Sequence, residues 1–365
     1  MEKYIVITFN SLTLAKACYY CDNTWGIKNT QILHIPSVID LPQSIVERYN
    51  AKLLPYQKRW SKFPFFAVVS DIKGIKNVWN AVRKEFADHN CQYNFVVFKD
   101  NEPRESTIIE KAKKNLRQRV SVILIEEGCG IYNDASHKVR YQKLWFLLYR
   151  VFGISQYCTK GLPQGVNPLV DEVICENTES FVKKQKKYCS QAKVTQQEAV
   201  FNCETNQKLL QLFCPEVLDN LPKKIDFVFL TMPWSDIQTQ ISVNQYKTFL
   251  TKLFEKLGRY GKVLVKLHPR DKFDYSEYTS KNVILCPQLD KLPFELLYFC
   301  LDMPTLVAIS SSCCTCAKEK ISYYLYKALF SNAKNTDISN DYCITNNIKM
   351  CSTIDELIED ISKHK

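Results

Sequence analysis

Reactive side chains follow three short apolar runs, and such runs are typical of strands buried in a parallel sheet. The clearest run, 263–267, ends at His268 and Pro269, and proline cannot donate a hydrogen bond to a strand ladder. Because open α/β sheets bind ligands outside the carboxyl ends of their strands, we expect His268 at a ligand site. Lys266 and Arg270 flank the histidine and suit it to an anionic group that gains charge during a reaction. The alternative is a loop histidine that only caps the strand.

Two adjacent carboxylates follow a second apolar run. Glu126 and Glu127 come directly after residues 120–125 and precede Gly128. Carboxylates at one strand end repel each other, which raises the pKa of one of them and favours a general base. The glycine lets a ligand approach the backbone closely. A solvated acidic turn is the competing interpretation, because acidic residues are usually exposed.

Hydroxyl groups follow the third run. Ser310, Ser311 and Ser312 come after residues 306–309 and precede a segment that we expect to be helical. Hydroxyls and amides at a helix N-terminus are able to hold a phosphate, although serines also cap helices without any ligand. Glu295 stands in the first turn of another expected helix, where it is able to bind a ribose diol or simply complement the helix dipole.

Strand-like and helix-like segments alternate along the chain, which predicts parallel sheets built from βαβ units. We therefore expect an α/β protein of two Rossmann-like domains that face each other across a cleft, with domains at 1–210 and 211–365. Among the elements are a strand at 65–70, a polar connector at 176–224 and a helix at 316–330. The sequence leaves open whether the C-terminal helix packs back on the first domain.

The net charge is +11, from 49 Lys and Arg against 38 Asp and Glu, and it favours anionic partners such as nucleotides, acidic glycans or anionic lipids. The lysines are dispersed and no nucleic-acid-binding motif appears, so we expect no nucleic-acid partner. An apolar segment at 144–153 is too short to span a bilayer. A buried helix is the favoured interpretation, and an interfacial patch helped by Lys138, Arg140 and Lys143 is the alternative.

The 16 cysteines are expected to be reduced thiols of a cytoplasmic protein, because the N-terminus begins as a strand and not as an export signal. Two clusters invite a metal interpretation, namely Cys18 with Cys21 and Cys313 with Cys314 and Cys316. Neither is accompanied by the second ligand pair that a zinc site needs, so we expect no metal.

In their order along the chain these motifs resemble those of bacterial sialyltransferases of glycosyltransferase family 52, which are related to family 38 polysialyltransferases and family 80 sialyltransferases. The resemblance is carried by Glu126-Glu127-Gly128, His268-Pro269 and the serines at 310–312. Supporting matches are Phe229-Leu230-Thr231-Met232-Pro233, Trp234-Ser235-Asp236, the segment 266–271 and Pro293-Phe294-Glu295. The likeness covers most of the second half and the segment 120–132, and the rest of the first half matches only in architecture.

The resemblance implies a GT-B type fold and the inverting transfer of sialic acid from CMP-sialic acid to a lipooligosaccharide or capsule-type glycan. It implies that Glu126 is the base, with Glu127 as the fallback because neighbours at a strand end face opposite ways. His268 would stabilise or protonate the departing phosphate. The first domain would hold the acceptor and the base, and the second would bind CMP. The donor-binding residues would be Lys266, Pro269, Glu295, Ser310, Ser311, Ser312, Thr231 and Pro233.

The resemblance implies no metal or other cofactor, and the sequence has no Asp-x-Asp motif. The third serine leaves the phosphate pair open between 310–311 and 311–312. A competing enzyme class uses another CMP- or CDP-activated donor, such as Kdo or glycerol phosphate. Two further interpretations are a basic nucleic-acid-binding protein and an inactive paralogue. Peripheral attachment to the inner face of the membrane, the acceptor, the linkage and the oligomeric state are left open.

Overall fold

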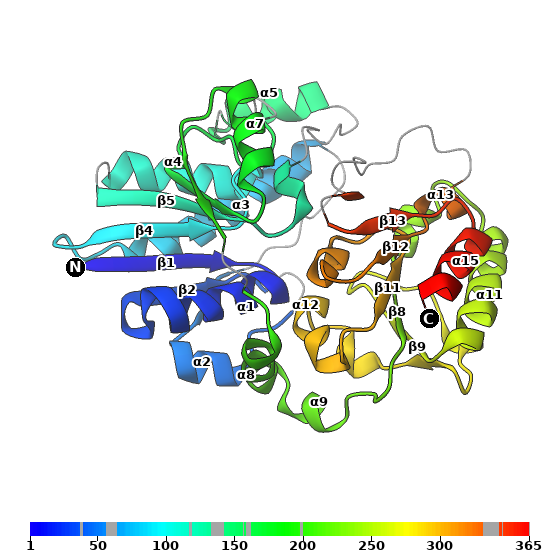
Figure 1. Cartoon of the computed structure of the whole chain (residues 1–365). Helices are drawn as coiled ribbons and strands as arrows, with labels where there is room; N and C mark the ends of the chain where they lie inside the picture. Colours follow the sequence, from blue (N-terminus) through cyan, green and yellow to red (C-terminus); the bar gives the residue numbers. More distant parts are fainter. Residues whose placement is uncertain are drawn as a thin grey trace. The chain divides into compact units, whose positions relative to one another are not determined.

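The structure is a computed structural model, which describes residues 1–36, 39–55, 64–116, 119–132, 142–155, 157, 162–197, 200–330, 343–344 and 346–364. The chain forms two compact units, Met1–Val200 and Phe201–Lys365, which Figure 1 colours from blue to green and from green to red. The unit boundary lies at residue 200, where the sequence analysis placed it at residue 210.

The first unit contains a sheet of seven parallel strands in the order β3-β2-β1-β4-β5-β6-β7. Its strands are β1 (Glu2–Thr8), β2 (Thr30–His34), β3 (Lys52–Leu53), β4 (Gln92–Val97), β5 (Val120–Ile125), β6 (Glu172–Cys175) and β7 (Lys193–Gln196). Consecutive residues of the central strands are buried, because both faces of the sheet are covered. The alternation that the sequence predicted therefore takes the doubly wound form.

Helices and short turns of helix connect these strands (Figure 1). The helices are α1 (Ser11–Tyr20), α2 (Gln43–Tyr49), α3 (Pro64–Glu85), α4 (Pro103–Leu116), α5 (Gln142–Val151) and α7 (Thr178–Tyr188). The short turns are η1 (Cys21–Trp25), η2 (Ile27–Asn29) and η4 (Cys129–Tyr132). The sequence analysis considered three basic residues beside the apolar segment at 144–153. Two of them, Lys138 and Arg140, lie outside the described residues, and so does the side chain of the third, Lys143.

Two predictions for the first unit were wrong. The segment 65–70 is not a strand but the start of α3. A short apolar run fits either element, and here buried Val68, Ile75 and Val82 recur every two helical turns, which decides for the helix. The connector expected after residue 176 was to be helical or loop, and α7 is helical, but the segment also contains strand β7, whose polar sequence suits an edge position.

The second unit contains six parallel strands in the order β10-β9-β8-β11-β12-β13. They are β8 (Phe227–Leu230), β9 (Val263–Lys266), β10 (Val283–Leu285), β11 (Thr305–Ala308), β12 (Ser322–Tyr324) and β13 (Ile348–Met350). The helices are α8 (Cys203–Phe213), α9 (Pro215–Asp219), α10 (Trp234–Ile237), α11 (Val243–Tyr260), α12 (Phe294–Leu297), α13 (Tyr326–Leu329) and α15 (Ile354–His364). Short turns are η5 (Ser276–Tyr278), η6 (Pro287–Leu289), η7 (Phe299–Leu301) and η8 (Ser312–Ala317).

The helix expected at 316–330 is also wrong. The cysteine-rich stretch forms only the six-residue η8, and the buried residues Ser322–Tyr324 form strand β12 beside β11. Aromatic residues favour this strand, and the run is too short for its pattern to separate strand from helix. The C-terminal helix α15 packs against α11 and buries Leu357 and Ile361 in the core of the second unit, not of the first.

Within the described part of the chain, no helix is both long enough and apolar enough to cross a membrane. The fourteen cysteines whose side chains are described are free thiols. No group of three His, Cys, Asp or Glu side chains in the same described ranges is arranged to hold a metal ion.

Two glycines at the end of α11 give a stability test of the second unit. A Cβ on Gly261 would lie 2.4 Å from Cγ of Asp226, whose carboxylate accepts the Lys262 amide. A Cβ on Gly258 would lie 3.6 Å from its nearest neighbour, and Gly258 is helical. We expect Gly261→Ala to destabilise the unit by about 1–3 kcal/mol and Gly258→Ala to stabilise it by about 0.5–1 kcal/mol. Urea unfolding of both variants measures this, and shifts of equal sign would contradict the packing described.

Candidate active site

The order of strands reverses once in each sheet. In the first sheet, β2 and β3 lie on one side of β1 and the later strands lie on the other side, so the direction in which strands are added reverses between β1 and β4. In the second sheet the same reversal falls between β8 and β11. Ligands of doubly wound sheets bind outside the carboxyl ends of strands at such a reversal. The candidate residues follow these strands or their neighbours: Glu126 and Glu127 follow β5, Thr231 follows β8, His268 follows β9, and Ser310 follows β11.

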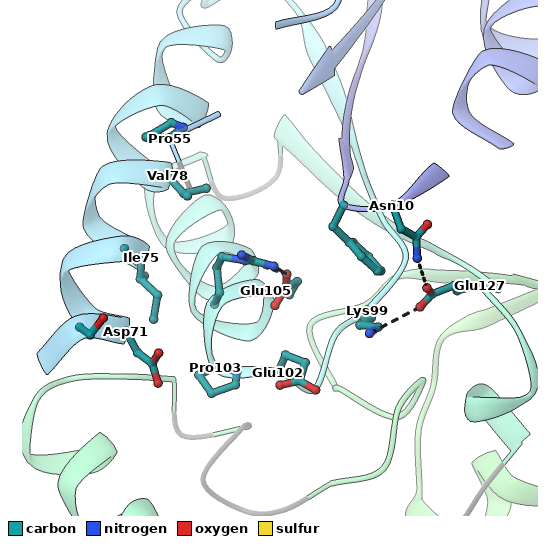
Figure 2. Close-up of a pocket in the computed structure, with 14 residues that line it drawn as sticks. Asn10, Pro55, Asp71, Ile75, Val78, Lys99, Glu102, Pro103, Glu105 and Glu127 are labelled. Carbon is teal, nitrogen blue, oxygen red and sulfur yellow. Dashed lines mark hydrogen bonds and ion pairs between the residues drawn. The ribbon is translucent and has the colours of Figure 1, made fainter. Parts of the chain in front are cut away.

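A pocket of about 400 Å³ lies at the reversal of the first sheet (Figure 2). Its walls come from the ends of β1, β4 and β5, from α3 and from the start of α4. It is lined by Phe9, Asn10, Pro55, Ser70, Asp71, Gly74, Ile75, Val78, Lys99, Glu102, Pro103, Arg104, Glu105 and Glu127. The lining is rich in carboxylates and hydrogen-bonding groups, which suits a polar ligand with several hydroxyls.

Glu127 points into this pocket, as Figure 2 shows. One carboxylate oxygen accepts a hydrogen bond of 2.6 Å from the amide of Asn10, and the other lies 3.7 Å from the ammonium of Lys99. The Lys99 ammonium also lies 4.7 Å from the centre of the Phe9 ring. The two partners hold the carboxylate in one orientation and leave it in contact with the cavity, which is the geometry a general base requires.

Asn10 is itself fixed by the helix that it caps. Its side-chain oxygen accepts the Thr13 amide at 2.8 Å, and Thr13 returns a side-chain bond to the cap, so the two residues form a capping box. The amide nitrogen of Asn10 is therefore aimed at Glu127 by the start of α1. Sequence reasoning missed Asn10 and Lys99, although both follow predicted strands and so carried the same positional signal as Glu127.

Glu126, the first choice as base, faces away from the pocket. It is buried, and one oxygen of its carboxylate accepts the Glu176 amide at 2.7 Å and the hydroxyl of Tyr132. The Tyr132 hydroxyl in turn accepts the Asn177 amide at 2.8 Å. Burial raises the pKa of Glu126, against the effect of the nearby Lys16 ammonium. This carboxylate ties the ends of β5 and β6 together and does not line the cavity.

In the second unit, the structure brings Thr231 and His268 together. The backbone amide of His268 donates to the Thr231 hydroxyl at 2.9 Å, and the Thr231 amide donates to the Lys266 carbonyl at 3.1 Å. Leu230 of β8 pairs with Lys266 of β9 on one side and with Ala308 of β11 on the other. The residues that follow these three strands therefore emerge at one level of the same sheet edge.

The hydrogen bonds of His268 fix where its proton resides. Nδ1 accepts the backbone amide of Arg270 at 3.1 Å, so in the neutral imidazole the proton lies on Nε2. Burial lowers the pKa of His268, and the charges of Arg270 and Lys266 lower it further. The side chain therefore presents a neutral Nε2–H donor near pH 7. Such a donor is suited to stabilising a phosphate oxygen through a hydrogen bond, without the positive charge of an imidazolium.

Lys266 lies beneath the sheet edge and is buried. Its ammonium donates to the carbonyls of Leu267 and Asp290, both at 3.0 Å. Burial lowers its pKa, while the charges of Asp290 and Glu295 raise it. The structure thus gives Lys266 a part in holding the loops after β9 and η6, which differs from the direct donor contact that the motif suggested.

The three serines have different surroundings. The Ser311 hydroxyl accepts the Cys313 amide at 3.3 Å and caps η8, and its carbonyl accepts the hydroxyl of Tyr324. The hydroxyls of Ser310 and Ser312 have no hydrogen-bond partner among the described residues and are partly exposed. The six residues of η8 make a much smaller dipole than the long helix expected there, so a role of this turn in phosphate binding would rest on the serine hydroxyls and stays a prediction.

Glu295 is in the first turn of α12 and lies beside the turn that follows the serines. Burial is the larger cause of the raised pKa of the Cys313 and Cys316 thiols. The carboxylate of Glu295 is close enough to both thiols to raise their pKa further. Asn206 of α8 donates to the Glu295 carbonyl at 2.8 Å and fixes the turn from the other side. Glu295 therefore lies beside η8, the turn that Ser311 caps, and the donor-binding role expected of both residues stays a prediction.

The loops after β8 and β9 are pinned by Asp271. Its carboxylate accepts the Trp234 amide at 3.1 Å and the Tyr275 hydroxyl at 2.9 Å. Pro233 is buried directly before Trp234, whereas Pro269 is exposed directly after His268. Both prolines shape the loops that carry Thr231 and His268, and Asp271 joins those loops.

Comparison with known proteins gives the fold. The sequence matches no family model and no curated protein. Solved structures of similar fold include the GT-B domain of a Photobacterium damselae sialyltransferase, at 14% identity and a TM-score of 0.53 over 96% of this chain and 98% of that one. They also include UDP-GlcNAc 2-epimerase from Methanocaldococcus jannaschii, at 12% identity and a TM-score of 0.54, with 100% of this chain and 92% of that one covered. A third is the wall teichoic acid polymerase TagF, at 13% identity and a TM-score of 0.54, with 98% of this chain and 79% of that one covered. The chain has two Rossmann-like domains of the GT-B type.

The environment of Glu126 predicts a pH-dependent stability. Because its pKa is raised in the folded chain, the folded state binds this proton more tightly than the unfolded state does. Stability is therefore lost as the pH rises through the unfolded pKa towards the folded one. Glu126→Gln cannot ionise, so we expect its thermal midpoint to exceed that of the wild type by an amount that grows as the pH rises above the pKa of an unfolded glutamate, about 4.3.

Tyr132→Phe is the companion variant, because it removes the hydroxyl donor and leaves the carboxylate buried. We expect it to destabilise the first unit by about 1–3 kcal/mol. Thermal unfolding across the pH series measures both effects. Parallel curves for the wild type and Glu126→Gln would show that Glu126 titrates as it does in the unfolded chain.

Proposed function

We propose that this protein is an inverting, metal-independent glycosyltransferase that moves sialic acid from CMP-sialic acid to a glycan acceptor, and that it is a distant relative of the family 52 sialyltransferases. The observation that carries the proposal is a pair of sites in one GT-B fold. A positioned carboxylate, Glu127, lies in a pocket of one Rossmann sheet. In the other sheet, His268 and two serine hydroxyls follow β9 and β11, the two strands that flank β8. A sialyltransferase among the proteins of similar fold supports it.

In the proposed reaction, Glu127 accepts the proton of an acceptor hydroxyl. The hydroxyl oxygen then bonds to the anomeric carbon of sialic acid from the face opposite CMP, and the bond from that carbon to the phosphate oxygen breaks. The electron pair of this bond leaves on the phosphate. His268 donates Nε2–H to that phosphate, and Ser310 and Ser312 offer their hydroxyls to its oxygens. Preorganised donors of this kind are typically worth about 3–4 kcal/mol each at a developing charge.

This assignment exchanges the roles of the two glutamates. Glu127 becomes the base because it lines the pocket, and Glu126 becomes a structural carboxylate because it is buried and bonded to Tyr132 and the Glu176 amide. Glu295 is proposed to hold the ribose, and Thr231 to position His268 through the bond between them. Ser311 serves the cap of η8 in this scheme.

A transferase for another CMP- or CDP-activated donor, such as Kdo or glycerol phosphate, is the second candidate. It is favoured by the similar fold of the wall teichoic acid polymerase TagF, whose structure was solved after a soak with CDPG. The length of the nucleotide phosphate separates a CDP-activated donor from CMP-sialic acid, and a transfer assay with CMP-Kdo in place of CMP-sialic acid separates the two CMP-activated donors.

Thermal unfolding with CMP, CDP, UDP, GDP and ADP, first without metal and then with EDTA, tests the donor. A ligand at about 100 times its dissociation constant adds roughly 2.7 kcal/mol and raises the midpoint by a few degrees. We expect stabilisation by CMP that survives EDTA. A larger effect of CDP would favour the second candidate, and stabilisation by UDP or GDP alone would exclude a cytidine donor. No response to any nucleotide would favour an inactive paralogue.

Matched variants test the base. We expect Glu127→Gln to lower the transfer rate by about 10²–10⁴-fold, because it removes the proton acceptor, and to keep the thermal shift with CMP. Glu126→Gln is the control, since it alters the neighbouring carboxylate without touching the pocket, and it should retain transfer. His268→Ala should damage both transfer and CMP binding. Loss of transfer in a folded Glu126→Gln enzyme, with transfer kept in Glu127→Gln, would return the base to Glu126.

A further inference from the structure

Five large apolar side chains of the first unit form an exposed patch at one end of two packed helices. The apolar patch consists of Phe65 and Phe66 in the first turn of α3 and Leu147, Val151 and Phe152 at the end of α5. Leu147 is 58% exposed and Val151 is 70% exposed. The ring of Phe65 lies 5.7 Å from that of Phe66 and 6.1 Å from that of Phe152, so the two helix ends make one surface.

The core does not account for these side chains. α5 packs on α3 through a separate small cluster in which Val68, Ile75 and Tyr149 are buried. Tyr149 also donates its hydroxyl to Asp71 at 2.7 Å, which fixes the packing of the two helices. α5 is therefore apolar on two faces, one used for packing and one exposed. The expectation of a buried helix at 144–153 is wrong for this second face.

The excess positive charge of the protein lies in the unit that carries the patch. Residues 1–200 contain 29 Lys and Arg against 19 Asp and Glu, whereas residues 201–365 contain 20 against 19. Exposed Arg150 lies between Leu147 and Val151 on α5, and exposed Lys73 lies two turns from Phe66 on the same face of α3. A second copy of the chain would bring the same excess charge to the patch and be repelled.

We propose that the apolar patch docks on the surface of membranes that contain anionic lipids. Aromatic and aliphatic side chains enter the headgroup region, and the basic surface of the first unit is attracted to the lipid charge. α3 connects this surface to the pocket, because Ser70 and Asp71 line the pocket one turn after Phe66. Docking therefore holds the pocket close to the membrane, where a lipid-linked ligand is available.

Co-sedimentation of the full chain with vesicles tests the proposal. The vesicles are phosphatidylcholine alone and phosphatidylcholine with about one third phosphatidylglycerol. We expect binding to the anionic vesicles that weakens as salt is raised, and little binding to the neutral ones. Leu147→Glu/Val151→Glu should lower the anionic-vesicle affinity by about tenfold or more, since it removes two inserted side chains and adds two repelled charges.

Ile27→Glu/Val243→Glu is the matched control. It also replaces two exposed aliphatic residues by carboxylates and changes the net charge equally, but at positions outside the apolar patch. We expect it to lower the affinity by less than about threefold. Unfolding midpoints equal to that of the wild type confirm that both variants are folded, which exposed positions favour.

Equal vesicle binding by the wild type and the patch variant would overturn the proposal, and so would the absence of binding to anionic vesicles at low salt. Sedimentation velocity without lipid adds a further outcome. If the wild type and the control variant are dimers and the patch variant is a monomer, the patch is the contact surface for a second copy of the chain. Neither donor nor acceptor is present in these assays, so their result is independent of the proposed transferase activity.

Discussion

Parallel pairing is the constraint on which both sites depend. All described strands in each sheet run in one direction, so the residues that follow them emerge along one edge. The central strands are buried on both faces and consist mostly of apolar residues, so most of the candidate residues fall among the first positions after each strand. The strand order reverses at that edge between β1 and β4 and between β8 and β11, and the pocket of the first sheet lies at the first of these reversals.

The same constraint separates two adjacent glutamates. Glu126 and Glu127 leave β5 in opposite directions, as the alternation of a strand requires. One enters a buried network with Tyr132, and its pKa rises there because burial disfavours the charge. The other reaches the pocket, where Asn10 and Lys99 hold it. Two residues of identical chemistry thus acquire a buried, hydrogen-bonded environment and a pocket-lining environment from a difference of one position.

The sequence predicted the architecture and the strand ends well, because apolar runs and the residues that end them are local features. Val263–Lys266, Thr305–Ala308 and Val120–Ile125 are strands as expected. It failed where a short apolar run fits two elements, as at 65–70 and 322–324, since neighbouring strands and helices decide between them. It also failed to separate Glu126 from Glu127 and missed Asn10, because the direction of a side chain and its partner 117 residues away are tertiary properties.

The distribution of charge gives the two units different physical tasks under the proposed function. The second unit has nearly balanced charge, and its available donors, His268 Nε2–H and the hydroxyls of Ser310 and Ser312, are neutral. Its motif lysine, Lys266, is buried against two carbonyls. Neutral, preoriented donors gain most when charge develops on the leaving phosphate. A strongly positive surface would instead hold donor and product alike and add nothing to the rate. Long-range attraction is then left to the first unit, which carries the excess charge together with the acceptor pocket and the apolar patch.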